Sequence, residues 1–211
     1  EWGGWPWTAD DHKEFGLSTY NLHSDGSGIA YSSRRRPIIT MRTGAVSYPD
    51  VPGSGLRHFS ADAHLWYWLE TMGYDFDVIT DDELHADGKA AIEGYDVVLT
   101  TTHPEYHTGE TLDALQEYTL QGGHFMYMGG NGFYWRVSYH PVLPGVIECR
   151  KSEDGIRASA PDPGEFYSSF TGEYTGLWRR NGRPPNELVG VGMVSQGFDR
   201  SSPYVRNADG H

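Results

Sequence analysis

Between residues 60 and 145, short apolar runs alternate with segments whose apolar residues recur every three or four positions. The three- to four-residue spacing predicts three helices, over residues 60–72, 81–94 and 108–121. Ser60 is the expected N-cap of the first helix, and Gly73 is expected to end it. The apolar and β-branched runs predict three strands, over residues 76–80, 96–101 and 124–128. Strands and helices that alternate with short joints are typical of a parallel sheet with helices on both faces, so we expect a three-layer α/β core.

Glycine, proline and serine interrupt the pattern on both sides of this core. Residues 1–59 are expected to be a loop-rich entry segment with one strand, Pro37–Met41. Residues 146–211 are expected to form loops and short β segments, with a strand over Leu188–Val194, that pack on the rest of a parent chain. The chain opens on Glu1 rather than methionine and stops in a polar stretch, which we interpret as an internal piece of a longer polypeptide.

The charge balance narrows the class of partner. The 211 residues include 16 Lys and Arg against 29 Asp and Glu, a formal net charge of −13. Nucleic acids and anionic membrane surfaces need a basic footprint, so neither is an expected partner. No apolar run approaches the ~20 residues that span a bilayer. The single cysteine, Cys149, excludes an internal disulfide and favours a soluble protein of the reducing cytoplasm.

A histidine and a carboxylate follow the predicted strand 96–101. His103 and Glu105 flank Pro104, which favours extended backbone for the residue before it. In an extended segment, side chains two positions apart share one side, so both would enter one pocket at the carboxyl end of a strand. Such a pair suits metal ligation or acid–base chemistry. Alternatively, Glu105 caps the next helix and His103 bonds a loop carbonyl.

Two glycine-containing segments are further candidates. The segment Ser18–Gly28 holds Tyr20, His23 and an aspartate, a set that could wrap a metal or a polar substrate. It could equally be an ordered surface loop with Asx turns. The segment Gly129-Gly130-Asn131-Gly132 allows close backbone approach to a ligand, and Asn131 offers an acceptor and two donors. Its alternative is a tight turn with positive φ.

The predicted core resembles the class I glutamine amidotransferase-like and flavodoxin-like folds. Glutaminases of that type use a cysteine nucleophile on a strand-to-helix elbow. Cys149 lies beyond the last core strand, and the serine elbow motif is present only in fragments, at Gly26-Ser27-Gly28. Covalent catalysis by cysteine or serine is therefore not expected.

Several separated motifs together resemble the large (beta) subunit of the N,N-dimethylformamidase family, in its C-terminal amidotransferase-like region. The resemblance covers most of the 211 residues. The motifs that carry it are Ser18–Gly28, Tyr31–Arg34, Arg36–Ile38, His58–Leu65, His103–Tyr106, Gly129–Trp135, Gly176–Arg180, Arg183–Pro185, Val189–Gly192 and Gln196–Arg200.

This resemblance implies a mononuclear ferric ion, Fe(3+), held by two tyrosines and a glutamate. The glutamate of the family's His-Pro-Glu-Tyr motif corresponds to Glu105, and one tyrosine corresponds to Tyr20, with Tyr31 as the fallback. The other tyrosine would precede Glu1, and a family glutamate that acts as a base would follow His211. Phenolate and carboxylate are hard oxygen donors that suit such an ion.

The resemblance also implies three further active-site residues, His103, Asn131 and Lys151. His103 could bond the liganding carboxylate or carry a proton, and Asn131 could orient a carbonyl or a water. Lys151 would stabilise developing negative charge. Alternatively, Lys151 is a solvated lysine among the neighbouring acidic residues Glu148, Glu153 and Asp154.

The expected reaction is hydrolysis of small amides such as N,N-dimethylformamide, to formate and dimethylamine. The expected partners are a small (alpha) subunit and further copies of the large subunit. Because a ligand and a base would lie outside residues 1–211, the isolated piece is expected to be inactive.

Two alternatives stay open. His23, His103 and Glu105 could form the two-histidine, one-carboxylate site of a non-haem iron or zinc enzyme, which would lack the visible band of phenolate on ferric iron. The chain could also be a non-catalytic binding or assembly module, because fold does not fix function.

Overall fold

The computed structural model describes residues 14, 16–36, 58–151, 158–159, 161 and 165–193, and the predicted strand Pro37–Met41 lies outside them. The elements of the described residues are, in chain order, β1 (Tyr31–Ser33), α1 (Phe59–Met72), α2 (Asp81–Asp87), the 3₁₀ helix η3 (Gly88–Ala91), β2 (Val97–Leu99), β3 (Tyr106–His107), α3 (Gly109–Leu120), β4 (His124–Met126), β5 (Trp135–Arg136), β6 (Ser138–Tyr139), β7 (Val146–Glu148) and α4 (Pro185–Val189).

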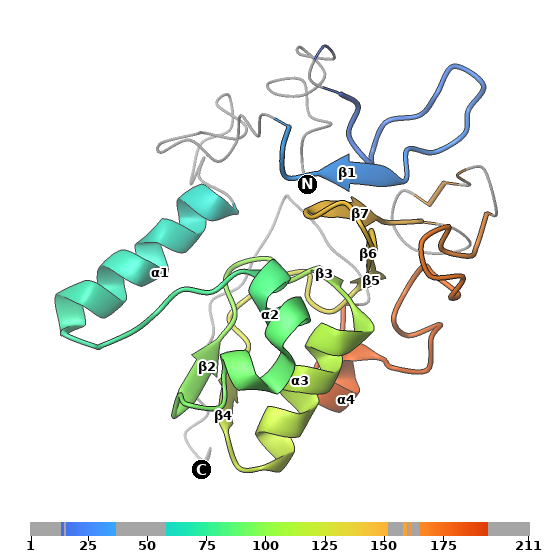
Figure 1. Cartoon of the computed structure of the whole chain (residues 1–211). Coiled ribbons are helices and arrows are strands. Elements are labelled where there is room, and N and C mark those ends of the chain that lie inside the picture. The colour runs from blue at the N-terminus through green and yellow to red at the C-terminus, as the bar shows by residue number, and fades with distance from the viewer. Residues whose placement is uncertain are drawn as a thin grey trace.

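The centre of the predicted core is present. Strands β2 and β4 pair in parallel, with α2 and α3 beside them (Figure 1). Val98 and Phe125 lie opposite each other in this pair and pack against a buried cluster to which α2 and α3 contribute. The members of that cluster are Leu84, Ile92, Leu112, Ala114, Leu115, Tyr118, Phe133 and Trp178. The predicted helix–strand alternation is therefore confirmed from α2 to β4, while the three-layer amidotransferase-like architecture stays a prediction.

Three local predictions are wrong. Residues 76–80 form no strand, and Val78 and Ile79 remain exposed (55% and 38%). His58 rather than Ser60 is the N-cap of α1, although Gly73 ends that helix with a left-handed backbone as expected.

The third error concerns the run Leu188–Val194, whose first two residues close helix α4 instead of starting a strand. The two prolines before it explain the difference. Pro184 is the N-cap of α4 and Pro185 occupies its first turn, where the fixed φ of proline favours a helix.

An antiparallel sheet brings the N-terminal part of the described chain against residues 138–148. Its strand order is β1-β7-β6, and Tyr31 of β1 lies opposite Glu148 of β7. The pairing continues past β7, where the Cys149 N–H donates to the Ala30 carbonyl at 2.7 Å. The segment before β1 and the residues after β7 are thereby neighbours in space.

A second parallel pair, β3 with β5, joins the loop after β2 to the C-terminal part. Tyr106 lies opposite Trp135, and the fully buried Trp178 donates its indole N–H to the His107 carbonyl at 3.1 Å. These contacts fix the backbone on either side of Tyr106.

No helix of the described residues is long and apolar enough to cross a membrane.

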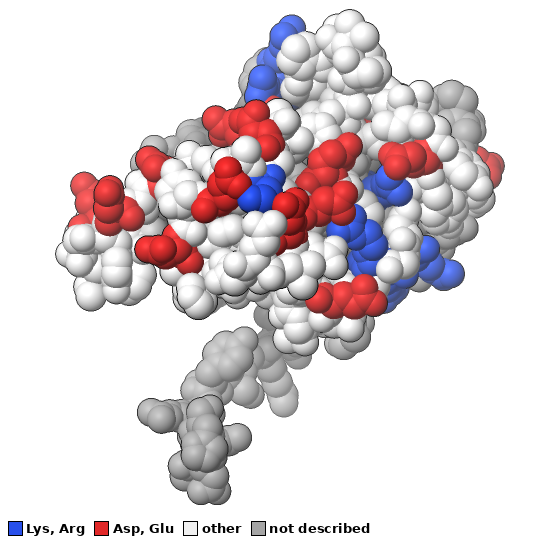
Figure 2. Space-filling model, turned by 60° about the horizontal axis from the view of Figure 1, so that its bottom comes forward, with Lys and Arg blue, Asp and Glu red and all other residues white. Residues whose placement is uncertain are grey.

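Figure 2 shows one face of the molecule, on which acidic side chains gather and basic ones lie among them. Several arginines pair with acids, as Arg183 does with Asp113 at 2.7 Å and Arg34 with Asp82. The arginine run at 34–36 thus includes an ion-pair partner for this acidic protein.

Candidate active site

The loop between β2 and β3 carries two of the predicted site residues. It is not extended, because the Glu105 N–H donates to the His103 carbonyl at 2.9 Å and closes a three-residue turn around Pro104. The φ that the proline ring imposes suits the centre of such a turn, which explains the difference from the expected extended backbone. The Asp62 carboxylate, on the first turn of α1, accepts from the Thr102 N–H at 2.9 Å and from its hydroxyl at 2.7 Å.

The glycine segment 129–132 packs against this loop. The Gly130 N–H donates to the Thr102 carbonyl at 2.8 Å. A Cβ on Gly129 would lie 2.8 Å from the Thr101 carbonyl oxygen, and one on Gly130 would lie 3.4 Å from the His103 ring. None of the three glycines has a positive φ. Gly129 is therefore required for close approach to the histidine loop, which places the turn that contains Asn131 beside that loop, whereas a Cβ on Gly132 would meet the Tyr127 ring instead.

Glu105 is buried, with 4% of its surface exposed. Its carbonyl accepts from the N–H groups of Tyr134 and Trp135, both at 3.0 Å. The helix-capping alternative is wrong, because Thr108 caps α3 in a reciprocal arrangement with Thr111. A carboxyl group held this far from water needs specific polar partners, so Glu105 stays a candidate for a functional role.

Two tyrosine hydroxyls meet, one from the N-terminal loop and one from Tyr106, the residue that follows Glu105 in the chain. The Tyr20 hydroxyl lies 2.5 Å from the hydroxyl of Tyr106, and one of the two donates to the other. The Lys151 ammonium lies 3.2 Å from the centre of the Tyr20 ring and 5.4 Å from that of Tyr106. It also donates to the Thr19 hydroxyl at 3.3 Å. One site is therefore formed by three parts of the chain: the N-terminal loop with Thr19 and Tyr20, then Tyr106, and then Lys151, which follows β7.

Lys151 is 1% exposed, so the alternative of a solvated lysine is wrong. A buried ammonium above an aromatic face gains a cation–π interaction of about 2 kcal/mol. The same charge lies where it could stabilise negative charge on a phenol oxygen or on a bound substrate.

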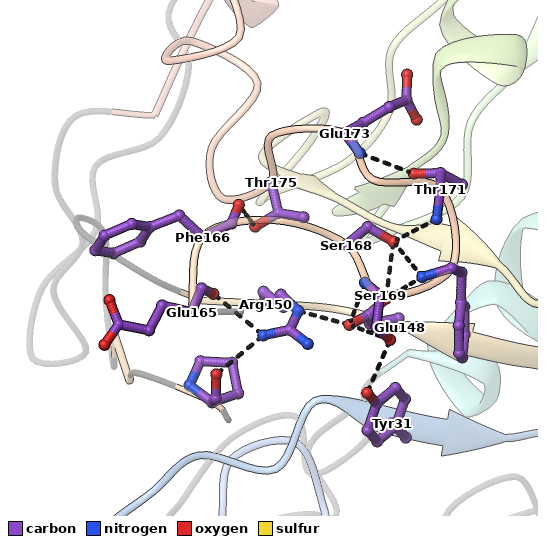
Figure 3. A network of polar contacts seen from close by, with 12 residues as sticks. Tyr31, Glu148, Arg150, Glu165, Phe166, Ser168, Ser169, Thr171, Glu173 and Thr175 are labelled. Carbon is purple, nitrogen blue, oxygen red and sulfur yellow. Dashed lines mark hydrogen bonds and ion pairs between the residues drawn. The ribbon is translucent and has the colours of Figure 1, made fainter. Parts of the chain in front are cut away.

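Tyr31, the fallback metal ligand, belongs to a different set of contacts (Figure 3). Its hydroxyl lies 2.8 Å from that of Ser169, and its ring lies against Phe170. Ser169 in turn bonds the buried Glu148 carboxylate, which pairs with Arg150 at 2.5 Å. This network holds the loop after residue 165 against β7.

The rest of the loop Ser18–Gly28 is an ordered turn, as its alternative interpretation states. Asp25 accepts from the Ser27 N–H at 2.9 Å, which is an Asx turn, and Leu22 and Gly28 form an isolated bridge. His23 is exposed. Within the described residues, no three His, Cys, Asp or Glu side chains gather as a possible metal site. The structure thus does not assemble His23, His103 and Glu105 as a ligand set.

The side chains proposed as ligands suit a hard cation better than a soft one. Phenol hydroxyls and a buried carboxyl side chain are oxygen donors that prefer ions of high charge. Cys149, the single thiol of the chain, belongs to the apolar cluster around Trp135. On donor chemistry, Tyr20 and Glu105 fit a ferric ion.

Sequence reasoning singled out Tyr20, Glu105 and Lys151 but not Tyr106 or Thr19. Tyr106 stands inside the His-Pro-Glu-Tyr motif, and that position was the available signal. The contact with Tyr20 depends on how two distant segments fold together, which no local pattern encodes.

The chain belongs to the family described as N,N-dimethylformamidase beta subunit-like, C-terminal, whose model matches residues 3–211. The resemblance inferred from the motifs is thereby confirmed. The chain is 42% identical, over 195 residues and 92% of its length, to the N,N-dimethylformamidase beta subunit of Paracoccus aminophilus. It is 41% identical, over the same share, to the protein of that name from an Alcaligenes species. The match covers 25% of each relative, so the chain spans about a quarter of their length.

Proposed function

We propose that this chain carries part of the active site of an N,N-dimethylformamidase-like amide hydrolase. The observation that carries the proposal is the meeting of Tyr20 and the buried Lys151 with Tyr106, the residue that directly follows the buried Glu105 in the chain. Membership of the family supports the substrate class, small amides such as N,N-dimethylformamide. Water cleaves the C–N bond of this amide to give formate and dimethylamine.

In this proposal, Tyr20 and Glu105 hold a mononuclear ferric ion, which would polarise the amide carbonyl and supply a water of lowered pKa. Lys151 presents positive charge to the oxygen on which negative charge develops. Asn131, in the turn beside His103, orients the substrate carbonyl or the attacking water. His103 holds or transfers a proton between that water and the leaving amine.

The names of the relatives support further parts of the proposal. A beta subunit implies a second kind of subunit, so a small alpha subunit and further copies of the large subunit are proposed partners. A cytoplasmic enzyme fits a chain with one cysteine. Since a tyrosine ligand and a base are proposed outside this chain, residues 1–211 alone should not hydrolyse the amide.

The test uses the complete enzyme with its partner subunit. Glu105→Gln is expected to lose both bound iron, measured by elemental analysis, and hydrolysis of N,N-dimethylformamide. Tyr20→Phe is expected to lose or shift the visible absorption of phenolate on ferric iron. The matched control is Glu117→Gln, on the exposed face of α3, which should keep iron and turnover. If Glu105→Gln kept both iron and turnover, the proposal would be wrong. Absence of bound iron in the wild type, together with no effect of Glu105→Gln, would favour a binding or assembly module.

A further inference from the structure

A second histidine lies against the proposed site. The rings of His58 and His103 meet edge to face, with centroids 4.7 Å apart and planes inclined by 65°. Nε2 of His58 and Nδ1 of His103 are both buried. The two residues come from different elements, since His58 starts α1 and His103 follows β2.

The backbone of His58 is strained. Its φ of 52° and ψ of −129° lie in a region that glycine occupies freely and that side-chain-bearing residues avoid. Strain of this kind persists where the surrounding structure enforces it, and it concentrates at functional sites.

Helix α1 does not need an imidazole at this position. The His58 side chain makes no capping hydrogen bond. Its contribution to the helix start is the carbonyl, which accepts from the N–H groups of Ala61 at 2.9 Å and Asp62 at 2.8 Å. Glycine would supply the same carbonyl without the strain, so helix formation alone does not explain a histidine here.

The contacts of the imidazole supply a reason. The first turn of α1 is attached to the histidine loop through Asp62 and Thr102. His58 therefore reaches His103 from a fixed support, while the His103 ring also lies against Gly130. A ring held from two segments has little freedom to change rotamer, which is the preorganisation that a proton-transfer group requires.

We propose that His58 is a positioning residue, which fixes the His103 imidazole in the active site and keeps a strained backbone to do so. This inference rests on the proposed function of His103. His58 acts through His103, so its replacement should lower kcat more than it changes KM.

The test compares two strain-relieving substitutions in the complete enzyme. Glu165 also has a positive φ, of 44°, but its side chain is exposed, and its carbonyl accepts a hydrogen bond from Arg150. Both His58→Gly and Glu165→Gly should raise Tm. Only His58→Gly should lower kcat, by about tenfold or more, with KM within about twofold. His58→Phe keeps a ring edge against His103 and should retain more activity than His58→Gly.

A crystal structure of His58→Gly gives a readout independent of turnover. We expect the His103 ring to occupy several rotamers there and one in Glu165→Gly. A single unchanged His103 rotamer, or a wild-type kcat in His58→Gly, would overturn the inference. Failure of the proposed function is distinguishable from failure of this inference, because the wild-type enzyme itself would then not hydrolyse the amide. In that case the comparison of His103 rotamers still decides the role of His58.

Discussion

The Tyr20 hydroxyl lies 2.5 Å from the Tyr106 hydroxyl, and this contact joins the N-terminal loop to the residue that follows Glu105. The pair is not isolated, because the Lys151 ammonium covers the Tyr20 ring. A metal-binding phenolate needs its orientation and its electron density fixed by neighbouring groups, and outer hydrogen bonds commonly do this. In the proposed site, Tyr106 would perform that task for Tyr20.

Tyr106→Phe should therefore impair the enzyme without unfolding it. The substitution removes one hydroxyl and keeps the ring that packs on β5. A hydrogen bond to a charged group contributes about 1.5–3 kcal/mol, which corresponds to a loss of roughly tenfold to a hundredfold in kcat/KM. Steady-state hydrolysis of N,N-dimethylformamide by the complete enzyme is the measurement, and the visible absorption band should shift.

Tyr31→Phe is the matched control for this prediction. Tyr31 is 41% exposed, and its hydroxyl contacts Ser169 rather than Tyr20 or Tyr106. Activity and colour should be unchanged in this variant. If Tyr31→Phe lost the iron and Tyr20→Phe kept it, the fallback ligand would be the correct one.

Lys151→Met should abolish most of the turnover while the protein remains folded. Methionine fills a similar volume, and replacing a buried charge by an apolar side chain often costs little stability. Electrostatic stabilisation of developing charge typically contributes a factor of about 10²–10³ to kcat, so a loss of that order is expected. Rates should be compared at saturating substrate, with circular dichroism to verify the fold.

Lys89→Met provides the comparison for Lys151→Met. Lys89 forms an i, i+4 ion pair with Glu93 on the surface of the helical layer. Exposed pairs of this type contribute little to stability. Activity should be unaffected, and equal losses in both variants would contradict a specific role of Lys151.

The sequence predicts the local elements of the core well, because their signals are local. Thr108 before the apolar spacing of 112, 115 and 118 marks the start of α3, and Gly73 marks the end of α1. The run 76–80 shows the limit of this reasoning. Its residues are apolar and β-branched, yet no described strand pairs with them, since a strand also requires a partner that the local sequence does not name.

The residues of the candidate site also fall into those that local sequence signals predict and those that they do not. The positions of Glu105 and Asn131 at the ends of β2 and β4 follow from the alternation of elements. The burial of Lys151 does not, because residues 148–154 are as polar as a surface segment. Its surroundings come from β1 pairing with β7, which carries Tyr20 and Thr19 to it from far away in the chain. Non-local pairing of this kind has no short-range signature.

Gly129→Ala should disturb the site through its backbone. The new Cβ would lie 2.5 Å from Cδ of Pro104 and 2.8 Å from the Thr101 carbonyl oxygen, and neither group is a flexible side-chain end. Overpacking of this type costs about 1–3 kcal/mol of unfolding free energy, and the loop must move. We expect a lower denaturant midpoint together with a lower kcat.

Gly94→Ala separates this effect from a general intolerance of glycine replacement. A Cβ on Gly94 meets no atom within 4 Å, and its φ is not positive. The variant should match the wild type in both measurements. A Gly129→Ala enzyme with unchanged stability and kcat would show that the close packing of the two loops is not required.

Glu148 should make the stability of the fold acid-sensitive. Burial alone would raise the pKa of this carboxyl, but hydrogen bonds from Ser168, Ser169 and Arg150 outweigh it and lower the pKa. An unfolded glutamate has a pKa of about 4.3. The stabilisation is therefore complete above that pH and is lost as the pH falls below it towards the folded pKa. Urea unfolding of the wild type from pH 7 to pH 3 should show this decline.

Glu148→Gln should be less stable at pH 7 and should lose part of that decline. The substitution leaves the fully buried Arg150 guanidinium without its counter-charge, which costs about 3–5 kcal/mol. The double variant Glu148→Gln/Arg150→Met removes both charges and should recover part of the loss. Glu187→Gln, on the exposed side of α4, should reproduce the wild-type curve. An identical pH dependence in wild type and Glu148→Gln would mean that the buried pair does not link stability to proton binding.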